Sequence, residues 1–349
     1  MIKTIKLLSR YFLAVVFLFS GFVKGVDPLG TAYKIEDYFI AYQMEWALPF
    51  SLGVSFLLIA LELSLGAFLI LQLLPKFTRW ASAILMLFFT AVTLYDAIYN
   101  PVPNCGCFGD ALILTNWETF YKNIVLDLCI IPLFIATKRN FRIQHIIIAF
   151  ILYFGALGFS YYNLQHLPII DFRFWKVGTQ VYNTDQQDTK IYLLYRNSST
   201  GETQEFISPN FPYQDSVWVA NWEFVSSREV APQQLQKSLM IFDQEGEDAT
   251  AEILGGHEMS LLLISNNLRD INEKQSAKIK ILIQITEDKS IPLFLITATV
   301  GKTATEFKDK YHIDLPLFLA DDIDLKTIIR SNPGLILIKQ GKIIKKWAS

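Results

Sequence analysis

Two of the chain's three cysteines, Cys105 and Cys107, stand one glycine apart in the stretch PVPNCGCFGD at residues 101–110. Cysteines at positions i and i+2 bring their Cα atoms within the roughly 4.4 to 6.8 Å that a disulfide requires, and Gly106 allows the backbone between them to fold. The ring that such a disulfide closes is small and strained, and strain raises its reduction potential. A labile disulfide of this kind suits thiol-disulfide exchange, which is the first function that the pair predicts.

Two other roles for the pair stay open. The disulfide could be a structural staple of its loop, and the two thiolates are candidate ligands of a metal. A structural zinc ion needs about four ligands, whereas this loop offers two thiolates and no histidine. The histidines of the chain are scattered without ligand spacing: His145, His166, His257 and His312.

The composition of the chain is uneven along its length, and it indicates what surrounds these thiols. Hydrophobic residues make up 52% and charged residues only 18% of the 349 residues, which is too apolar for an ordinary soluble protein. The apolar excess lies almost entirely before residue 165, and the remainder has the composition of a folded aqueous domain. A net charge of -2 provides no basic field and argues against nucleic acid as a partner.

Five apolar segments have about the 20 residues that cross the hydrocarbon core of a bilayer. They are residues 7–26, 50–73, 80–99, 120–135 and 146–164. We interpret the first as a retained helix and not a cleaved signal, because no small-residue cleavage site follows it and further spans do. The lipid bilayer is therefore a predicted partner, and the predicted fold begins with a multi-span α-helical membrane domain.

Lysine and arginine in the short loops set the predicted orientation, since cytoplasmic loops carry the excess of positive charge. They gather before the first segment, between the second and third, and between the fourth and fifth: Lys3, Lys6, Arg10, Lys76, Arg79, Lys138, Arg139 and Arg142. A cytoplasmic N-terminus and five crossings place the cysteine loop and everything after about residue 167 outside. The sequence predicts a multi-pass protein of the cytoplasmic (inner) membrane with a periplasmic C-terminal part.

Acidic residues inside the apolar segments form a second candidate site, because a carboxylate in hydrocarbon is unfavourable unless it is paired, protonated or hydrated. Glu62 lies near the middle of the second segment, Asp127 within the fourth, and Asp96 near the outer end of the third, where an interfacial position explains it. We expect Glu62 and Asp127 to face an inward polar site, with Lys122 and Lys24 nearer the outer surface. The alternative is a protonated or hydrogen-bonded packing contact.

The third cysteine is expected to lie apart from the pair. Thr115, with Glu118 three residues later, predicts an N-cap, so that the fourth membrane helix begins near Asn116. At about 1.5 Å per residue, Cys129 then lies roughly 20 Å from that end of the helix. We therefore interpret Cys129 as a buried apolar residue and not as a relay from the loop to a membrane quinone.

The exported part divides near Lys237 into a β-rich and an α/β segment. TKIYLLYRNSSTGETQEFIS predicts a β-hairpin, and LMIFDQEGEDATAEIL predicts a second one. MSLLLIS and IPLFLITAT then predict strands, AKIKILIQITED and TATEFKDKYH predict helices, and a short strand, a helix and a hairpin that turns at Gln340-Gly341 close the chain. The predicted domains are residues 1–140, a fifth membrane helix at 141–167, a β-rich segment at 168–237 and an α/β domain at 238–349.

This order of elements, with Pro333 directly before the strand GLILI and the turn KQGKII after it, resembles the thioredoxin-like fold of membrane-anchored TlpA and peroxiredoxin relatives. In that family the proline is cis and lines the substrate groove, so the resemblance implies a cis Asn332-Pro333 bond and makes Pro333 a candidate groove residue. The family's Cys-x-x-Cys would follow LLLIS, where this sequence reads NNLRDINE. Without a thiol, the domain is not expected to exchange disulfides by itself.

The fragments FLFSGFVKG, LELSLGAFL, NCGCFGD and NIVLDL resemble DoxX-like membrane proteins, specifically the methylamine-utilisation MauE group, over about residues 5–140. Cys-Gly-Cys-Phe-Gly is the most specific of these fragments, and Lys122 departs from the arginine expected before the asparagine of the fourth segment. The resemblance implies a four-helix membrane module linked to maturation or disulfide formation in exported proteins.

Two functions of different classes follow. In the first, Cys105 and Cys107 are the catalytic pair of a thiol-disulfide component that acts on an exported protein client, with a membrane quinone as the candidate electron acceptor. In the second, the protein is a non-catalytic scaffold in which the cysteine loop is stapled and the thioredoxin-like domain docks protein partners. The two functions differ in whether the cysteine pair cycles between its dithiol and disulfide forms.

Overall fold

The computed structural model describes residues 2–135, 143–182, 190–208, 210, 212, 215–230 and 239–348. They belong to two compact units. The first holds Met1–Lys176, Lys326–Gly334 and Trp347–Ser349, and the second holds Val177–Leu325 and Leu335–Lys346. The third group of predicted cytoplasmic charges, Lys138, Arg139 and Arg142, lies outside the described residues, as do the predicted domain boundaries at residues 140 and 237.

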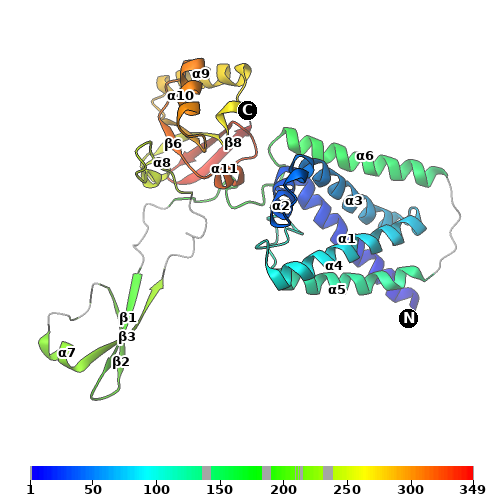
Figure 1. Cartoon of the computed structure of the whole chain (residues 1–349), viewed down its shortest axis with the longest axis horizontal. Helices are drawn as coiled ribbons and strands as arrows, with labels where there is room; N and C mark the ends of the chain where they lie inside the picture. Colours follow the sequence, from blue (N-terminus) through cyan, green and yellow to red (C-terminus); the bar gives the residue numbers. More distant parts are fainter. Residues whose placement is uncertain are drawn as a thin grey trace. The chain divides into compact units, whose positions relative to one another are not determined.

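The first unit is built from α-helices (Figure 1). The helices are α1 Ile2–Val26, α2 Pro28–Ala41, α3 Ser51–Leu71, α4 Pro75–Tyr99, α5 Asn116–Ile130 and α6 Ile143–Gln165. Two 3-10 helices extend this set: η1 (Glu45–Phe50) leads into α3, and η2 (Ile131–Phe134) continues α5. The predicted apolar segments thus form helices, with α2 as an additional helix between the first two.

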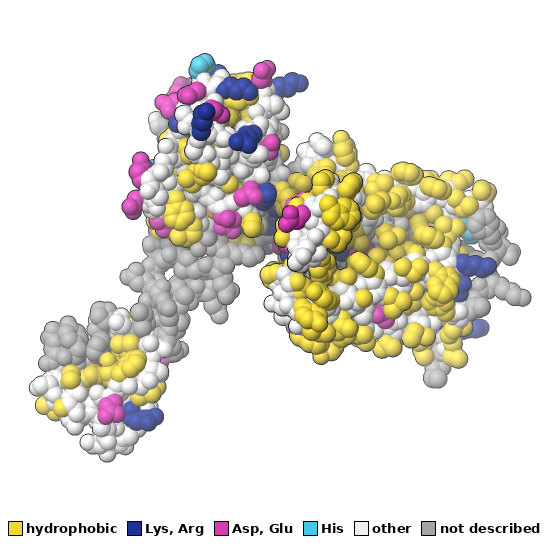
Figure 2. Space-filling model, viewed as in Figure 1, with side chains coloured by type: hydrophobic (Ala, Val, Ile, Leu, Met, Phe, Trp, Pro, Cys, Tyr) yellow, Lys and Arg dark blue, Asp and Glu magenta, His cyan; other side chains and the backbone are white. Residues whose placement is uncertain are grey.

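Four helices among the described residues are long and apolar enough to cross a membrane: α1, η1 with α3 (Glu45–Leu71), α4 and α6. They correspond to the first, second, third and fifth predicted segments. Figure 2 shows the visible face of this unit largely covered by apolar side chains. Such a surface is covered by lipid and not by water, so the chain is a multi-pass membrane protein.

Helix α5 is shorter than the fourth predicted segment. Its 15 residues span about 22 Å at 1.5 Å per residue, and Pro132 follows in η2. The helix begins beside the end of α4, where Asn116 Nδ2 donates a hydrogen bond to Asn100 Oδ1 at 2.9 Å. The turn η2 lies beside the start of α4, where Arg79 Nη1 donates to the Leu133 carbonyl at 3.4 Å. Together α5 and η2 run the length of α4, and a fifth membrane crossing at this point stays a prediction.

Helices α1 and α3 pack backbone to backbone at two glycines. A Cβ atom on Gly21 would lie 2.9 Å from the backbone nitrogen of Leu63, and one on Gly66 would lie 2.9 Å from the carbonyl oxygen of Ala14. A methyl group would overlap these backbone atoms, so only glycine allows this approach. Buried apolar residues of four helices surround the contact, among them Leu13, Phe17, Leu65, Met86 and Leu126. The close contact fixes α1 against α3.

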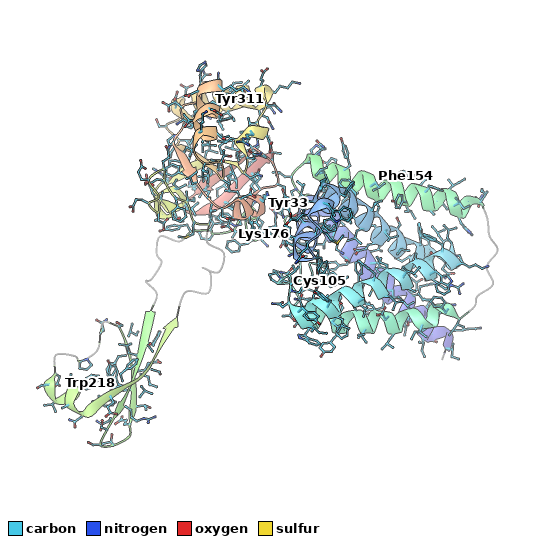
Figure 3. All side chains as sticks on the ribbon, in the orientation of Figure 1. Tyr33, Cys105, Phe154, Lys176, Trp218 and Tyr311 are labelled. Atoms are coloured by element: carbon cyan, nitrogen blue, oxygen red, sulfur yellow. The ribbon has the colours of Figure 1, made fainter. Side chains whose placement is uncertain are left out.

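The second unit contains a small antiparallel sheet with the strand order β2-β1-β3. Its strands are β1 Lys190–Asn197, β2 Thr203–Ile207 and β3 Trp222–Val230, and helix α7 (Ser216–Asn221) precedes β3. Tyr192 pairs with Ile207 across β1 and β2, which confirms the first predicted hairpin. The rings of Tyr195 and Trp218 stand edge to face with centroids 4.9 Å apart, so aromatic contacts hold α7 to the sheet (Figure 3).

A five-stranded sheet follows along the chain, with the strand order β6-β5-β4-β7-β8. The strands are β4 Met259–Ser265, β5 Leu293–Thr297, β6 Leu317–Leu319, β7 Gly334–Lys339 and β8 Lys342–Ala348, and the helices are α8 Thr250–Gly255, α9 Glu273–Asp288, α10 Lys302–Tyr311 and α11 Asp322–Ile328. Strands β4, β5 and β6 are parallel, and β5 is buried along its whole length. Continuous apolar runs such as LFLIT are typical of strands in this position.

The strands and helices predicted from residue 259 onward are confirmed, and the Asn332-Pro333 bond is cis as expected. The second predicted hairpin is wrong. Phe242 makes a single bridge with Asp248, and the following residues form the short helix α8. Asp248 Oδ1 accepts a hydrogen bond from the Thr250 nitrogen at 2.8 Å, which favours the start of a helix over a second strand.

Candidate functional site

The cysteine loop, residues 100–115, connects α4 to α5 at the end of the helix bundle opposite the N-terminus (Figure 3). Its ends are tied together by Asn116, whose Nδ2 donates to Asn100 Oδ1 and to the Val102 carbonyl, both at 2.9 Å. The predicted N-cap is confirmed as a capping box in which Glu118 accepts from the Thr115 nitrogen at 2.8 Å. The helix start and these hydrogen bonds hold the loop that carries the thiols.

The structure brings Cys105 and Cys107 together, as their spacing predicts. Both are free thiols, and their sulfur atoms lie 2.9 Å apart in a hydrogen-bonding contact. Gly106 between them has φ +66°, and a Cβ atom there would lie 2.9 Å from Lys34 Cγ. The left-handed conformation of Gly106 turns the backbone so that the two sulfur atoms lie side by side. A small further approach of the sulfurs would allow a disulfide bond to form.

A buried ion pair lies beneath the loop. Lys24 Nζ of α1 donates to Glu62 Oε1 of α3 at 2.6 Å and to Ser20 Oγ at 3.1 Å. Lys24 is 6% and Glu62 1% exposed, and no hydrogen-bond partner is found for Glu62 Oε2 among the described residues. Ser20 Oγ in turn donates to the Cys107 carbonyl at 2.7 Å, so the ion pair is linked to the cysteine loop.

Cys107 lies in an electropositive environment. The hydrogen bond from Cys105, together with the charges of Lys122 and Lys24, lowers the pKa of Cys107 to about 6, against the opposing effect of burial. The Lys122 ammonium group lies 4.4 Å from the ring centroid of Phe108, the residue next to Cys107. A thiol in such surroundings is a thiolate at neutral pH and thus the reactive form of cysteine.

Cys105 lies in a different environment. The hydrogen bond to Cys107 and burial raise its pKa well above the ordinary value, although Tyr38 and Lys24 act in the opposite direction. The Tyr38 hydroxyl of α2 donates a hydrogen bond to Asp96 Oδ2 at 2.6 Å. The two thiols therefore differ, since Cys107 is stabilised as a thiolate and Cys105 as a protonated thiol.

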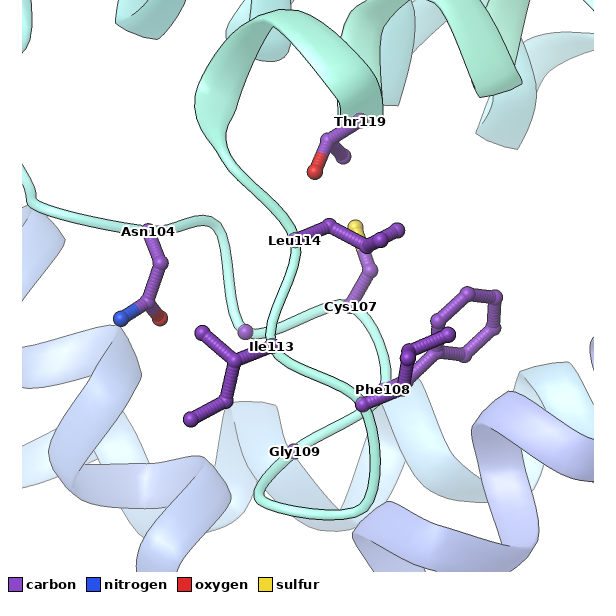
Figure 4. A pocket seen from close by; sticks show the side chains of 9 residues that line it. Asn104, Cys107, Phe108, Gly109, Ile113, Leu114 and Thr119 are labelled. Carbon is purple, nitrogen blue, oxygen red and sulfur yellow. The ribbon is translucent and has the colours of Figure 1, made fainter. Parts of the chain in front are cut away.

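Cys107 also lines a small pocket in the loop (Figure 4). Phe108, Ile113, Leu114 and the Thr119 side chain line it as well. In Figure 4 the Cys107 side chain is directed toward Leu114 and Thr119. Cys105 is not among the lining residues, so of the two thiols only Cys107 faces this pocket.

The predicted polar site inside the membrane is only partly assembled. Glu62 pairs with Lys24, whereas Asp127 accepts a hydrogen bond from Thr90 at 2.7 Å and no contact between Asp127 and the ion pair is found in the described part of the chain. Asp96 is 1% exposed and accepts a hydrogen bond from Tyr38, so its carboxylate is buried within the protein, and its position at the membrane interface stays a prediction. The side chain is buried because α2 covers the end of α4.

Cys129 packs against the apolar cluster of α1, α3, α4 and α5, which agrees with its interpretation as an apolar core residue. Pro333 directly precedes β7, and its carbonyl accepts a hydrogen bond from Ser331 Oγ at 2.7 Å. Its position in a substrate groove stays a prediction.

Sequence reasoning missed Ser20 and Tyr38. Both are signalled by spacing, because Ser20 and Lys24 lie four residues apart on α1, and Tyr38 of α2 lies four residues before Tyr42, the C-cap residue of that helix. Residues at i and i+4 share one helix face. The spacing does not reveal which partner this face meets, and here Tyr38 and Tyr42 both donate to Asp96.

The membrane part is similar to a known family. The family model described as "Methylamine utilisation protein MauE" matches residues 2–136, from α1 through α5 and η2, and so covers the ion pair and the cysteine loop. No curated protein matches the chain. The family match and the apolar helices agree, and the N-terminal part of this chain is a multi-helix membrane region that is similar to the MauE family.

Proposed function

We propose that Cys105 and Cys107 carry out thiol-disulfide exchange with exported proteins on the periplasmic side of the cytoplasmic membrane. The single observation that carries this proposal is the asymmetry of the two adjoining thiols, 2.9 Å apart. Cys107 has a pKa of about 6 and lines the pocket of the loop, whereas the pKa of Cys105 is raised and this residue does not line the pocket. An attacking thiolate next to a resolving thiol is the arrangement that exchange requires.

In the reducing direction, the Cys107 thiolate attacks one sulfur of a client disulfide and releases the other client sulfur as a thiolate. A mixed disulfide between Cys107 and the client results. The Cys105 sulfur, on losing its proton, then attacks Cys107, which breaks the mixed disulfide and leaves the Cys105-Cys107 disulfide. The client gains two electrons and the cysteine pair loses two.

In the oxidising direction the same steps run backwards, and the pair takes two electrons from a client dithiol. The reduced pair must then be reoxidised. We propose a membrane quinone as the acceptor, which takes two electrons from the pair and two protons, one from the Cys105 thiol and one from water, to become a quinol. The strain of the small Cys-Gly-Cys ring favours this direction, because a strained disulfide is the more oxidising one.

The exported α/β region is proposed to be a thioredoxin-like domain without thiols, and the membrane bundle to be related to DoxX-like proteins. The strand order β6-β5-β4-β7-β8 and the cis proline before β7 support the first of these. Asn266 and Asn267 follow β4 where the redox motif would stand, so this domain is assigned the docking of a protein client and not electron transfer.

The periplasmic position of the thiols requires a cytoplasmic N-terminus and three crossings before the cysteine loop, whereas a periplasmic C-terminal part requires five. Alkaline phosphatase folds only outside the cytoplasm, so fusions after residue 103, in the cysteine loop, and after Ser349 should be active, while a fusion after residue 74, between α3 and α4, should be inactive. An inactive fusion after residue 103, together with a cytoplasmic reporter that is active there, would place the thiols on the wrong side for exported clients, and the same result at Ser349 alone would contradict the fifth crossing.

Exchange itself is tested by trapping the mixed disulfide in intact cells. Cys105→Ser removes the resolving thiol, so Cys107 should remain bonded to its clients and form adducts that disappear on reduction. Cys107→Ser is the matched control and should form few adducts, because it removes the thiol that lines the pocket.

A second measurement separates exchange from a structural staple. In wild-type protein the pair should be reducible by glutathione. A wild-type pair that is fully oxidised and resists glutathione, combined with an absence of adducts in both variants, would reject exchange and favour the non-catalytic scaffold.

A further inference from the structure

The part of the cysteine loop that carries Cys107 packs against one face of α1. Ser20 Oγ of α1 donates a hydrogen bond to the Cys107 carbonyl at 2.7 Å. The rings of Phe19 and Phe108, the residues next to these two, lie with their centroids 5.3 Å apart, and Phe108 is buried. The backbone at Cys107 is thus held against a membrane helix by a hydrogen bond and by a ring contact.

The hydroxyl group of Ser20 is directed toward the loop by the lysine one turn later in α1. A serine within a helix commonly turns its hydroxyl back to the carbonyl group four residues earlier. Here Lys24 Nζ donates to Ser20 Oγ at 3.1 Å, and an ammonium group has hydrogen-bond donors only. Because Lys24 cannot accept the Ser20 proton, this proton is left for the Cys107 carbonyl.

Glu62 of α3 holds Lys24 in this position. Its Oε1 accepts from Lys24 Nζ at 2.6 Å, and a Cβ atom on Gly21 would lie 3.1 Å from Glu62 Cβ, so the close approach of α1 and α3 brings the carboxylate to the lysine. The side chains of Glu62, Lys24 and Ser20 are all buried. Water therefore competes little for these hydrogen bonds, and the three groups form one polar chain from α3 to the Cys107 backbone.

The position of the Cys107 backbone matters for the second chemical step, in which Cys105 attacks the Cys107 sulfur. An intramolecular reaction is fast where the reacting atoms are held about 3 Å apart, and the two sulfur atoms lie 2.9 Å apart. We propose that Ser20 is a positioning residue that holds Cys107 within reach of Cys105, and that Lys24 and Glu62 act through Ser20 by orienting its hydroxyl. This role rests on the exchange function proposed above and assigns the residue that prepares its resolving step.

The two chemical steps can be measured separately in the purified full-length chain in detergent micelles, with Cys129→Ser in every protein so that only the pair reacts. The reduced protein is mixed with an aromatic disulfide. The Cys107 thiolate attacks one sulfur of this reagent, and the other half leaves as a first coloured thiolate. Cys105 then gives its proton to water and attacks the Cys107 sulfur. The bond between Cys107 and the reagent breaks, and its electron pair leaves on a second coloured thiolate.

Ser20→Ala should slow the second release by about tenfold or more, because Cys107 is no longer held near Cys105. The first release should stay unchanged, since it depends on the Cys107 thiolate and not on its distance from Cys105, and an unchanged first release also shows that the protein is folded. Ser20→Thr keeps the hydroxyl group and should give a faster second release than Ser20→Ala.

The matched control is Ser64→Ala. Ser64 of α3 is also buried in the bundle, but no hydrogen-bond partner of its hydroxyl is found among the residues that the structure describes. This variant should leave both releases unchanged.

A second release at the wild-type rate in Ser20→Ala would overturn the positioning role. So would an equal loss in both releases, or a Ser20→Thr protein that is no faster than Ser20→Ala. The outcome for the exchange function is separate. If the second release depends on Ser20 in micelles while Cys105→Ser traps no client in cells, the positioning role stands and the proposed exchange with exported proteins fails.

Discussion

Alkylation of Cys107 in the reduced protein should rise with pH around a midpoint near 6, while Cys105 stays almost unreactive up to pH 9. Only the thiolate reacts, and the thiolate of Cys107 is stabilised by the hydrogen bond from Cys105 and by the charges of Lys122 and Lys24. At pH 7 a thiol with a pKa of about 6 is roughly 90% ionised, against about 3% for an unperturbed thiol, a difference in thiolate fraction of about 30-fold. Timed alkylation followed by mass spectrometry of the loop peptide reports each cysteine separately.

A matched pair of lysine variants isolates the electrostatic cause. Lys122→Met should move the midpoint of Cys107 upward, because it removes a positive charge near the sulfur. Lys76→Met removes a lysine at the start of α4, the end of the helix away from the cysteine loop, and should leave the midpoint unchanged. Two cysteines that titrate together near pH 9 would contradict the assignment of Cys107 as the attacking thiol.

Lys24→Met should lower the free energy of unfolding by about 3–5 kcal/mol. The substitution leaves Glu62 charged and 1% exposed without its partner, and breaking one side of a buried ion pair has an effect of this size. The double variant Lys24→Met/Glu62→Leu should regain most of the loss, because apolar residues of similar volume replace a buried pair at little expense. Unfolding by dodecyl sulfate in mixed micelles, followed by circular dichroism, measures the difference.

The control for the ion pair is Lys122→Met, which removes a lysine that contacts the Phe108 ring and is only partly buried. This variant should lose no more than about 1 kcal/mol. A Lys24→Met protein as stable as the wild type, or a double variant no more stable than the single one, would show that Lys24 and Glu62 are not a buried charged pair.

The sequence predicts the membrane helices well, because bilayer thickness sets their length and no partner is needed to recognise a long apolar run. The α5 segment shows where this reasoning weakens. Its apolar run extends beyond Ile130, but Pro132 changes the geometry, so the α-helix is shorter than the run. Strands such as LFLIT are predicted correctly because a strand that is buried on both faces has an unbroken run of apolar residues.

Short elements are less predictable. ATAEIL reads as the second arm of a hairpin, yet a local hydrogen bond from Thr250 to Asp248 begins a helix of six residues. The candidate site shows the same limit. The proximity of Cys105 and Cys107 can be predicted from their spacing in the sequence. The burial of Asp96 cannot be predicted in this way, because it depends on the contact between Tyr38 of α2 and the end of α4.

The glycine contact between α1 and α3 also bears on how this protein responds to temperature. Helices that meet in lipid expel no water from between them, so their association rests on dispersion and hydrogen bonds. The buried strands β4 and β5, by contrast, leave water when they fold, and that transfer carries a large change in heat capacity. Cooling should therefore weaken the sheet while it leaves the packing at Gly21 and Gly66 nearly unaffected, and only the sheet is subject to cold denaturation.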